Sequence, residues 1–462
     1  MTSLDALTSL WRDAGQPADA LSMLRLTGSE PVLPSSFAVG TCAQASIGAA
    51  ALAAAELWRM RGGGLQEVSV DMRHAAVEFR SERYLRVGGA PPGEIWDKIA
   101  GAYRCGDGRW VRLHTNFTHH RDGVLAILGC AYDRAAVQAA LDRWKAEDFE
   151  TAAADKGLVV TAMRSFAEWD AHPQGRAVAT LPAVSIEKID GSPAEKLPPA
   201  ERPLSGIRVL DLTRIIAGPV CGRTLAAHGA EVLLVTAPHL PAVEPLVIDS
   251  GRGKRSTQID LRERTGCIAL EALLAGADVF VQGYRPGGIG ARGYSPELAA
   301  RIRPGIVYVT LSAYGPVGPW AARRGFDSLV QTASGFNAAE AEAAGKDAPQ
   351  PLPCQALDHA SGYLMAFGAM AALRRRALEG GSWHVRVSLA GTGHWLRGLG
   401  RVEGGLACAD PDQAAVRDLL EETPSGFGPL TAVRHAAHLS ATPTRWARPS
   451  VPLGTHPPAW AG

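Results

Sequence analysis

Four short β-rich segments separated by helical stretches constrain the fold of this chain more than any other feature. The segments are Ile207–Leu212, Glu231–Val235, Asp278–Gln282 and Ile306–Leu311, with helical stretches such as Val220–His228 and Thr265–Ala275 between them. Strands that alternate with helices form βαβ units, which assemble into a parallel sheet with helices on both faces. We therefore predict an α/β fold with a doubly wound, Rossmann-like parallel sheet, whose ligand binds beyond the carboxyl ends of the strands.

The length and the linkers of the chain predict several domains around that sheet. A chain of 462 residues is too long for one hydrophobic core. The stretch Asp190–Pro203 is rich in proline and charge, as linkers are. Before it, residues 41–62 are predicted to be helical, and Ala102–Leu113 is predicted to be a hairpin. We expect an N-terminal helical region (1–95), a small α+β domain (96–189), the linker (190–203), the Rossmann-like domain (204–350), a connecting helix (351–395) and a tail that packs on the large domain (396–462).

The net charge and the cysteine content limit the classes of partner and cofactor that we expect for the protein. The 47 basic and 46 acidic residues nearly balance, which argues against a nucleic acid or an anionic membrane as partner. The seven cysteines include no C-x-x-C pair, and His119-His120 has no acid or cysteine at ligand spacing, so we expect neither disulfides nor a metal site. The N-terminus lacks the apolar core of a secretory signal, and Ile47–Leu57 is too short to span a bilayer. A reduced, cytoplasmic protein is the simplest expectation.

One internal repeat links two distant parts of the chain. Ala45–Met72 and Ala360–Leu389 each contain Ala-Ser, an apolar helical run, an arginine-bearing end, a glycine cluster and a short alternating segment. The copies differ just before the Ala-Ser pair, where Asp358 precedes only the second copy and the first has Thr41-Cys42-Ala43-Gln44. Only the second copy can therefore use a carboxylate.

Asp358 has two interpretations from the residues alone. It stands at or just before the start of a helix predicted over Gly362–Leu373, close to unpaired N–H groups and the positive end of the helix dipole. Such surroundings favour the ionised carboxylate, so we expect Asp358 to be negative at neutral pH. The group is then either an ordinary N-cap or a catalytic carboxylate.

Loops after the predicted strands contain further candidate ligand-binding residues. Ala217-Gly218-Pro219 precedes a helix and could hold a phosphate or a pantetheine amide at the helix N-terminus, or be a plain turn. No G-x-G-x-x-G motif is present, which argues against a dinucleotide site. Tyr284 and Arg285 follow another strand and could contact a flat ring and a phosphate, unless the loop is simply flexible.

Two other features in this half of the chain also have alternative interpretations. Arg252, Lys254 and Arg255 form a basic cluster that suits paired phosphates, although a solvated charge run is the common alternative. Cys221 has no local histidine, so a packed thiol is expected rather than a nucleophile.

Ordered motifs across residues 202–362 resemble the class III CoA-transferases, the carnitine and bile-acid CoA-transferase family. The motifs are RPLSGIRVLDLTRIIAGP, HGAEVLLV, GKRSTQIDL, ADVFVQGYRPGGIG, YVTLSAYGPVGP, GFDSLVQTASG and ALDHASG. Weaker matches are AYRCGDGRWVRL, RSFAEWDAHPQ and PSVPLGTHPP. The order of the parts is permuted relative to the family, which makes the first helix copy a structural relic of a fused arrangement.

The resemblance implies a function and a site. Asp358 matches the catalytic aspartate, which would carry CoA as an aspartyl-CoA thioester between an acyl-CoA donor and a carboxylic acid acceptor. Coenzyme A and acyl-CoA would be substrates, with no permanent cofactor and no metal, and the family predicts a homodimer. The matching CoA contacts are Ile216, Ala217, Ile259, Asp260, Leu261, Arg262, Gly283, Tyr284, Arg285 and Arg292.

The chain departs from the family pattern at several positions. Thr236 and Ala237 stand where an acid and a basic residue are usual, and Ala291 replaces an arginine, with Arg292 one residue later. Acyl-CoA racemases of the family use a histidine where this chain has Phe326, which removes their base. The alternatives that stay open are a racemase-like, isomerase or lyase enzyme, and a non-catalytic CoA-binding relative.

Overall fold

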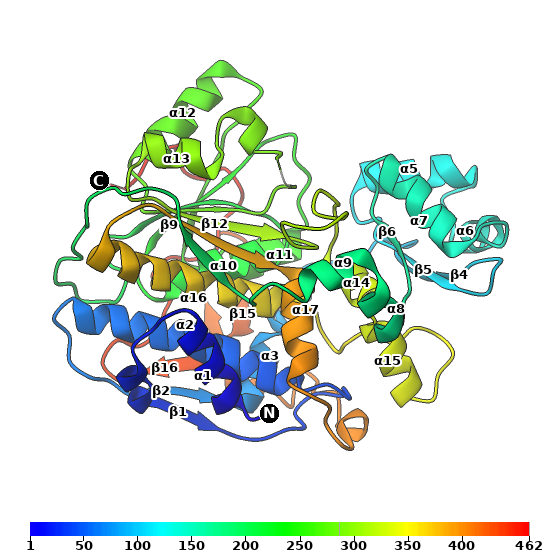
Figure 1. Ribbon diagram of the computed structural model, residues 1–462, viewed down its shortest axis with the longest axis horizontal. Coiled ribbons are helices and arrows are strands. Elements are labelled where there is room, and N and C mark those ends of the chain that lie inside the picture. Colours follow the sequence, from blue (N-terminus) through cyan, green and yellow to red (C-terminus); the bar gives the residue numbers. More distant parts are fainter. Residues whose placement is uncertain (286, 462) are drawn as a thin grey trace.

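The computed structural model describes residues 1–285 and 287–461; Pro286 and Gly462, the last residue of the expected tail, lie outside this range. Its centre is a sheet that has seven strands within the described residues (Figure 1). In spatial order these are β10 (Lys254–Gln258), β9 (Glu231–Thr236), β8 (Arg208–Leu212), β11 (Val279–Gln282), β12 (Val307–Ser312), β13 (Trp383–Ser388) and β7 (Ser185–Lys188). All pair in parallel except β7, which is antiparallel to β13. The predicted α/β doubly wound sheet is confirmed.

Helices cover both faces of this sheet, which explains why its strands are apolar runs rather than alternating ones. On one face, α10 (Ala217–Ala227) and α16 (Ala356–Glu379) pack on inward residues such as Val209 and Val309. On the other, α12 (Arg264–Ala275) and α13 (Pro296–Ile302) pack on Leu210 and Phe280. The strand order reverses between β8 and β11, so the crevice for a ligand opens beyond these two strand ends.

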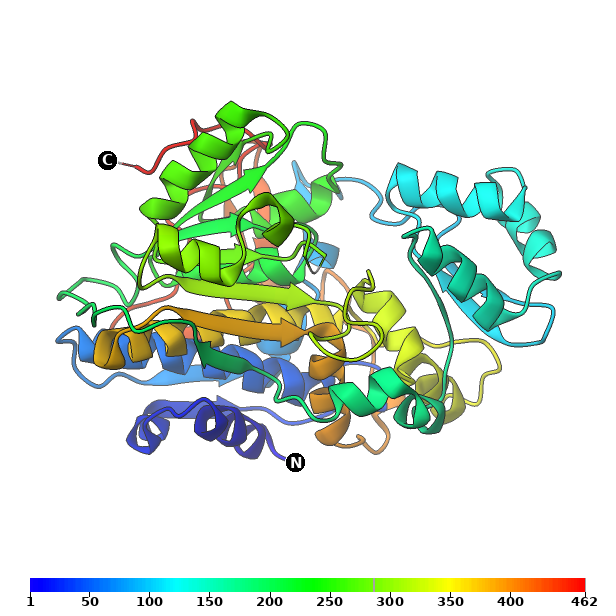
Figure 2. The same cartoon turned by 45° about the horizontal axis from the view of Figure 1, so that its top comes forward.

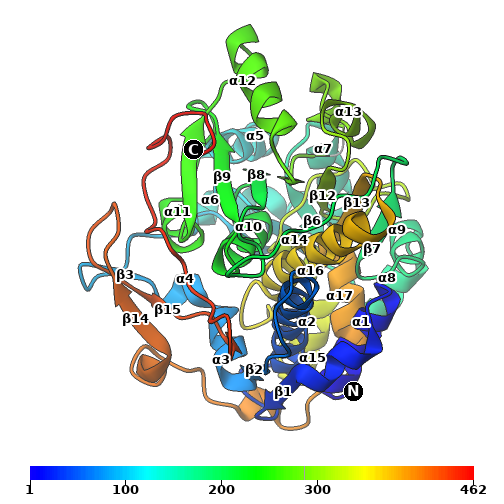
Figure 3. The same ribbon diagram turned by 90° about the vertical axis from the view of Figure 1, so that its left-hand side faces the viewer.

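A second sheet lies beneath α16 and belongs mostly to the N-terminal region. It contains β1 (Leu24–Thr27), β2 (Val68–Asp71) and β16 (Ala437–Leu439), with β1 parallel and β16 antiparallel to β2. The long helix α2 (Val39–Met60) joins β1 to β2 and packs along α16 (Figure 3). Helices α1 (Ser3–Asp13), α3 (Met72–Glu78) and α4 (Ser81–Tyr84) and the 3₁₀ turn Ala18–Met23 complete the region. The region expected to be helical therefore also contains strands.

The predicted repeat is confirmed and is longer than the sequence indicated. The first repeat (residues 39–84) consists of α2, β2, α3 and α4, and the second repeat (residues 356–398) of α16, β13 and α17 (Leu389–Gly398). In each, the last residue of the strand caps the next helix: Asp71 accepts from the N–H of His74, and Ser388 from that of Gly391. Strand β7 follows the first repeat but pairs with β13, and β16 follows the second but pairs with β2. The two halves therefore exchange their last strands.

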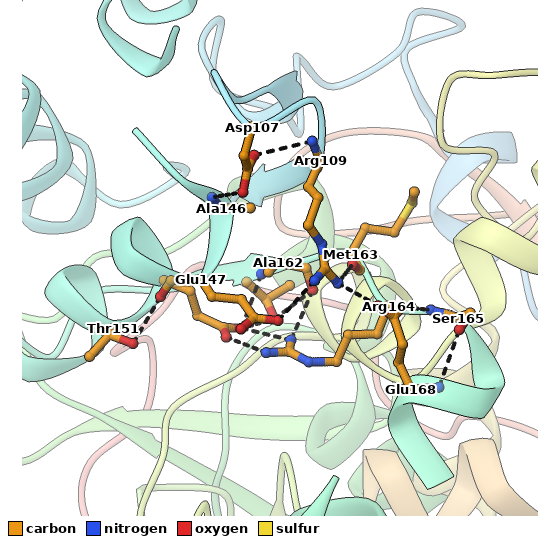
Figure 4. A network of polar contacts seen from close by, with 12 residues as sticks. Asp107, Arg109, Ala146, Glu147, Thr151, Ala162, Met163, Arg164, Ser165 and Glu168 are labelled. Atoms are coloured by element: carbon orange, nitrogen blue, oxygen red, sulfur yellow. Dashed lines mark hydrogen bonds and ion pairs between the residues drawn. The ribbon is translucent and has the colours of Figure 1, made fainter. Parts of the chain in front are cut away.

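The small domain lies to one side of the main body (Figure 2). It has the predicted hairpin, β4 (Gly101–Arg104) and β5 (Trp110–Leu113), with β6 (Val160–Ala162) beside β5. Helices α5 (Thr118–Leu128), α6 (Arg134–Leu141) and α7 (Ala146–Asp155) cover it. A buried ion pair joins Glu150 to Arg164 at 2.6 Å, and Arg109 bridges Glu147 and Glu168 (Figure 4). This network ties the domain to α8 (Phe166–Ala171), which leads through α9 (Pro173–Val178) to β7.

The remaining elements connect these parts. They are α11 (Glu244–Ser250), α14 (Asp327–Ala333), α15 (Phe336–Ala343), a sheet of β3 (Arg86–Val87), β14 (Leu420–Thr423) and β15 (Leu430–Val433), and the 3₁₀ turns Gly290–Arg292, Gly405–Ala407 and Arg417–Leu419. The end of the tail lies along β10, where the N–H of His456 donates to the carbonyl of Ser256 at 2.7 Å. None of the helices in the described residues combines the length and the apolar character needed to cross a bilayer.

Candidate active site

One cavity of about 460 Å³ opens beyond the carboxyl ends of β8 and β11. Its lining includes every candidate residue proposed from the sequence: Ile216, Ala217, Ile259, Asp260, Leu261, Arg262, Gly283, Tyr284, Arg285, Arg292 and Asp358. The structure therefore brings Asp358 and ten residues from three other segments around a single space.

Two glycines bring α16 and the loop after β8 into close contact. A Cβ on Gly362 would lie 2.6 Å from the carbonyl oxygen of Ala217 and 2.7 Å from Val220, so α10 and α16 meet at van der Waals distance only because that atom is missing. A Cβ on Gly218 would lie 2.3 Å from the side chain of Thr213, which explains the small residue in the first turn of α10. This packing places the first turn of α16, and Asp358 with it, at the loop that begins α10.

The loop itself contains a strained residue. Ile215 has a φ of 76°, in the left-handed region that a β-branched side chain rarely adopts. The next residue, Ile216, is the N-cap of α10, and its side chain accepts no hydrogen bond there. Residues in such conformations persist where surrounding structure enforces them, often at binding sites. The turn leaves the N-terminal N–H groups of α10 beside the cavity, where the helix dipole favours an anion.

Arginines supply positive charge to the same cavity. Arg214, Arg285, Arg292 and Arg324 line it, and none has a carboxylate within 4 Å among the residues that the structure describes. Burial lowers the pKa of Arg214 and Arg324. Arg262, by contrast, already binds Asp260 at 2.6 Å. Guanidinium groups without a carboxylate partner suit phosphate oxygens.

The basic cluster noted in the sequence lies elsewhere, and both interpretations of it are wrong. All three side chains are buried and paired: Arg252 with Asp249 at 2.9 Å, Lys254 with Asp211 at 2.9 Å and Arg255 with Glu231 at 3.4 Å. The cluster is therefore neither a phosphate site nor a solvated face. It neutralises acids on α11, β8 and β9, and the pairs with Asp211 and Glu231 join segments distant in sequence, which residues close together do not reveal.

Asp358 does not cap α16, which corrects the capping interpretation. The helix begins two residues earlier, with Gln355 as its N-cap, and Asp358 lies in the first turn. The cap comes from another helix: Oδ2 of Asp327 on α14 accepts the N–H groups of Leu357 at 2.8 Å and of Asp358 at 2.9 Å. The side chain of Asp358 is thus left to face the cavity.

The expectation that Asp358 is kept ionised by the helix is also wrong for the free protein. Asp358 is 7% exposed, and burial, followed by the negative charges of Asp327 and Glu82, raises its pKa well above the ordinary value. Burial also raises the pKa of Asp327 to about 6, against the opposing effect of its hydrogen bonds. Asp327 occupies the anion position at the helix N-terminus, so the dipole stabilises Asp327 instead of Asp358.

The small domain contributes a wall that sequence reasoning missed. Phe117, His119 and His120 line the cavity together with Phe326. Burial lowers the pKa of His120 to about 3, so this imidazole is neutral at physiological pH. The two histidines had been considered only as metal ligands, and no group of three or more metal-ligating side chains exists among the described residues. Their position at the start of α5, the helix that follows hairpin strand β5, is the one signal for them in the sequence.

Cys221 is a packed thiol, as expected. It is fully buried in α10, and burial raises its pKa far above the ordinary range. A thiol in this state is not a nucleophile.

Residues 204–403 match the family model of CoA-transferase family III, which confirms the resemblance recognised from the sequence.

Relatives with this likeness include enzymes and solved structures. An acyl-CoA transferase of Gibberella moniliformis is 30% identical over 368 residues, covering 70% of this chain and 64% of that protein. A probable fatty acyl-CoA transferase of Mycobacterium tuberculosis is 35% identical over 201 residues, covering 41% and 50%. A crystal structure of a hypothetical protein from M. tuberculosis has 32% identity and a TM-score of 0.40, covering 45% of this chain and 58% of that one. The chain thus spans less than two thirds of the length of these relatives.

Proposed function

We propose that this protein is a CoA-transferase that moves CoA from an acyl-CoA thioester to a carboxylic acid. The observation that supports this most is the placement of Asp358 in one cavity with the N-terminus of α10 and four arginines that have no carboxylate partner among the described residues. A CoA molecule needs this combination of a phosphate-binding rim and a reactive group at the far end of an extended thiol arm.

The proposed contacts follow the cavity lining. Arg285 and Arg292 would bind phosphate, and Ile216 and Ala217 would contact the pantetheine arm beside the N–H groups of α10. The remaining proposed CoA contacts are Ile259, Asp260, Leu261, Arg262, Gly283 and Tyr284. All these residues line the cavity, and Asp358 lies where α10 and α16 meet.

The proposed reaction uses Asp358 as a covalent carrier. The ionised Asp358 oxygen attacks the thioester carbonyl, the C–S bond breaks, and CoA leaves as a thiolate from the mixed anhydride. The thiolate then attacks the Asp358 carbonyl, which yields an aspartyl-CoA thioester and releases the donor acid. An acceptor carboxylate then attacks the aspartyl-CoA thioester and releases CoA thiolate, which forms a second mixed anhydride. The thiolate attacks the acceptor's carbonyl in this anhydride, so that a new acyl-CoA leaves and Asp358 is a free carboxylate again. The buried position of Asp358 and the wall of Phe117 and Phe326 would protect these intermediates from water.

Racemase chemistry has less support. The position of the expected base is Phe326, whose ring stacks on His114 with centroids 3.9 Å apart. Burial lowers the pKa of His114 to about 3, so it is a poor base at neutral pH.

The homodimer and the cytoplasmic location stay predictions. The exchange of β7 and β16 within one chain already completes both sheets, which reduces the need for a second copy. Sedimentation equilibrium of the purified protein would measure the oligomeric state.

Hydroxylamine trapping tests the proposed reaction. We expect incubation with acyl-CoA and hydroxylamine to convert Asp358 to a hydroxamate that peptide mass spectrometry detects. Asp358→Asn should give no adduct, whereas Asp418→Asn, which changes an exposed partner of Arg73, should behave like the wild type. CoA exchange at the wild-type rate in Asp358→Asn would sink the proposed mechanism.

A further inference from the structure

We propose that Glu82, from the first repeat, is a positioning residue of the catalytic centre, where it fixes His359 and places a negative charge beside Asp358. The inference rests on the proposed function and goes beyond it, because it gives the first repeat a part in the site. The resemblance had implied that the helix copy in this repeat is only a structural relic.

The contact between Glu82 and His359 is direct and buried. Oε2 of Glu82 lies 3.1 Å from Nε2 of His359, and the imidazole is 1% exposed. Phe79 stacks on the same ring with centroids 5.5 Å apart and an interplanar angle of 25°. His359 follows Asp358 in the first turn of α16, so two side chains of the first repeat fix the nucleophile's immediate neighbour.

The segment that carries Glu82 is anchored on both sides. Arg83 donates to the carbonyl of Pro353, in the loop that leads into α16, at 3.4 Å. Ser81 donates to Asp249 at 2.6 Å, and the buried Arg80 pairs with Asp410. The segment therefore cannot move away from α16 without breaking contacts to three other parts of the chain.

The charge of Glu82 acts on Asp358 as well as on His359. After burial, the negative charges of Asp327 and then of Glu82 raise the pKa of Asp358. The titratable or charged groups around this end of α16 are Asp327 on α14, Glu82 on α4, Asp249 on α11, His359 on α16, Cys354 just before it, Cys42 on α2, Arg112 on β5 and Arg80. Among these, Asp327 is committed to capping α16, whereas Glu82 has no capping duty. Glu82 can therefore be changed without unfolding the start of the helix.

The chemical consequence is a more basic nucleophile. A carboxylate with a raised pKa ionises at higher pH, but once ionised it attacks a carbonyl faster, because nucleophilicity rises with basicity. Removing the charge of Glu82 should therefore shift reactivity to lower pH and weaken the fully ionised nucleophile.

The test is the pH profile of Asp358 trapping in Glu82→Gln, which keeps the size of the side chain and a hydrogen-bond acceptor for His359. We expect the lower inflection of trapping rate against pH to move to lower pH, and the plateau to fall a few-fold. Glu82→Ala should show the same shift with a larger loss, because it also releases the imidazole.

Glu56→Gln is the matched control. Glu56 is also a buried acid of the first repeat, paired with Arg59 at 2.7 Å and with Arg374 at 3.4 Å. Arg374 lies about 24 Å along α16 from Asp358, at a rise of about 1.5 Å per residue. The control should lower thermal stability and leave the inflection of the profile in place.

The outcomes separate the two proposals. No adduct on Asp358 in the wild type overturns the proposed function, and with it the role of Glu82. An adduct in the wild type together with an unshifted inflection in Glu82→Gln overturns the inference alone, even if the plateau falls, because that result indicates a purely structural contact.

Discussion

The two repeats share one arrangement of helix and strand but differ in their roles. Both α2 and α16 are buried, and in both the first turn is capped by a carboxylate from an upstream segment. Glu30 accepts the N–H of Thr41 at 2.7 Å, and Asp327 accepts the N–H groups of Leu357 and Asp358. Burial raises the pKa of both capping acids. The helix therefore forms without an aspartate of its own, and an acid added in its first turn is available for chemistry.

A second difference concerns the neighbour of each helix. In α16, Gly362 lets α10 approach to contact distance, whereas the corresponding residue of α2 is the buried Ile47. Only the second repeat thus contacts the loop after β8, which lines the cavity. A reactive helix in this molecule needs both the acid and the close neighbour.

The largest expected effect is the loss of activity in Asp358→Asn. Without a nucleophile, CoA exchange between acyl-CoA and a carboxylic acid should fall by at least about a thousandfold. Adding Ala43→Asp to this variant should restore nothing, because position 43 lies outside the cavity lining. Recovery of exchange in the double variant, measured by chromatography of the acyl-CoA products, would show that the repeats are interchangeable.

Ala43→Asp alone should act on stability. Ala43 is fully buried, and a carboxylate there lacks the space and the partners that surround Asp358. We expect the free energy of unfolding to drop by about 3 kcal/mol or more, measured by chemical denaturation. A loss well under 1 kcal/mol would mean that the first repeat retains a pocket for the acid.

Gly362→Ala should separate α10 from α16. The added methyl group meets the carbonyl of Ala217 at 2.6 Å, so we expect a loss of about 1–3 kcal/mol and weaker CoA binding in calorimetry. Ile47→Val is the counterpart in α2, with an expected cost of about 0.5–1.5 kcal/mol. CoA affinity should be unchanged in that control, and an equal loss in both variants would contradict the special role of the α10 contact.

The smallest effect is a change of slope in stability against pH. Asp327 and Asp358 have raised pKa values in the folded protein, with Asp327 at about 6, so the folded state binds more protons than the unfolded state above about pH 4. Their contribution is complete at low pH and is lost as pH rises through the folded pKa. Denaturation at a series of pH values should therefore show a flatter decline above about pH 4 in Asp358→Asn than in the wild type. Parallel curves would argue against a raised pKa.

The fold was largely predictable because its signals are local. The four strands were placed to within one residue, since strands buried on both faces are continuous apolar runs between turn residues. The ordered motifs identified the part of the cavity lining that lies in the large domain and at the start of α16. The start of α16 was placed too late, because its cap is supplied by Asp327, about 30 residues upstream, and not by the residues next to it.

Contacts between distant segments were beyond sequence reasoning. His119 reaches the cavity because the small domain folds over it, and Glu82 meets His359 across 277 residues of chain. The ionisation of Asp358 was predicted in the wrong direction for the same reason. A helix dipole can be read from local sequence, whereas the burial and the neighbouring acids that outweigh it cannot.

The exchange of end strands has a consequence for how the chain acquires its structure. Strand β2 ends at Asp71, but its partner β16 begins only at Ala437, far downstream in the chain. One edge of β2 must therefore stay unpaired until β16 has been made, and unpaired edges are sites of aggregation. Pairings between such distant segments also slow folding. We expect production of this protein to depend on chaperones more than its size alone would indicate.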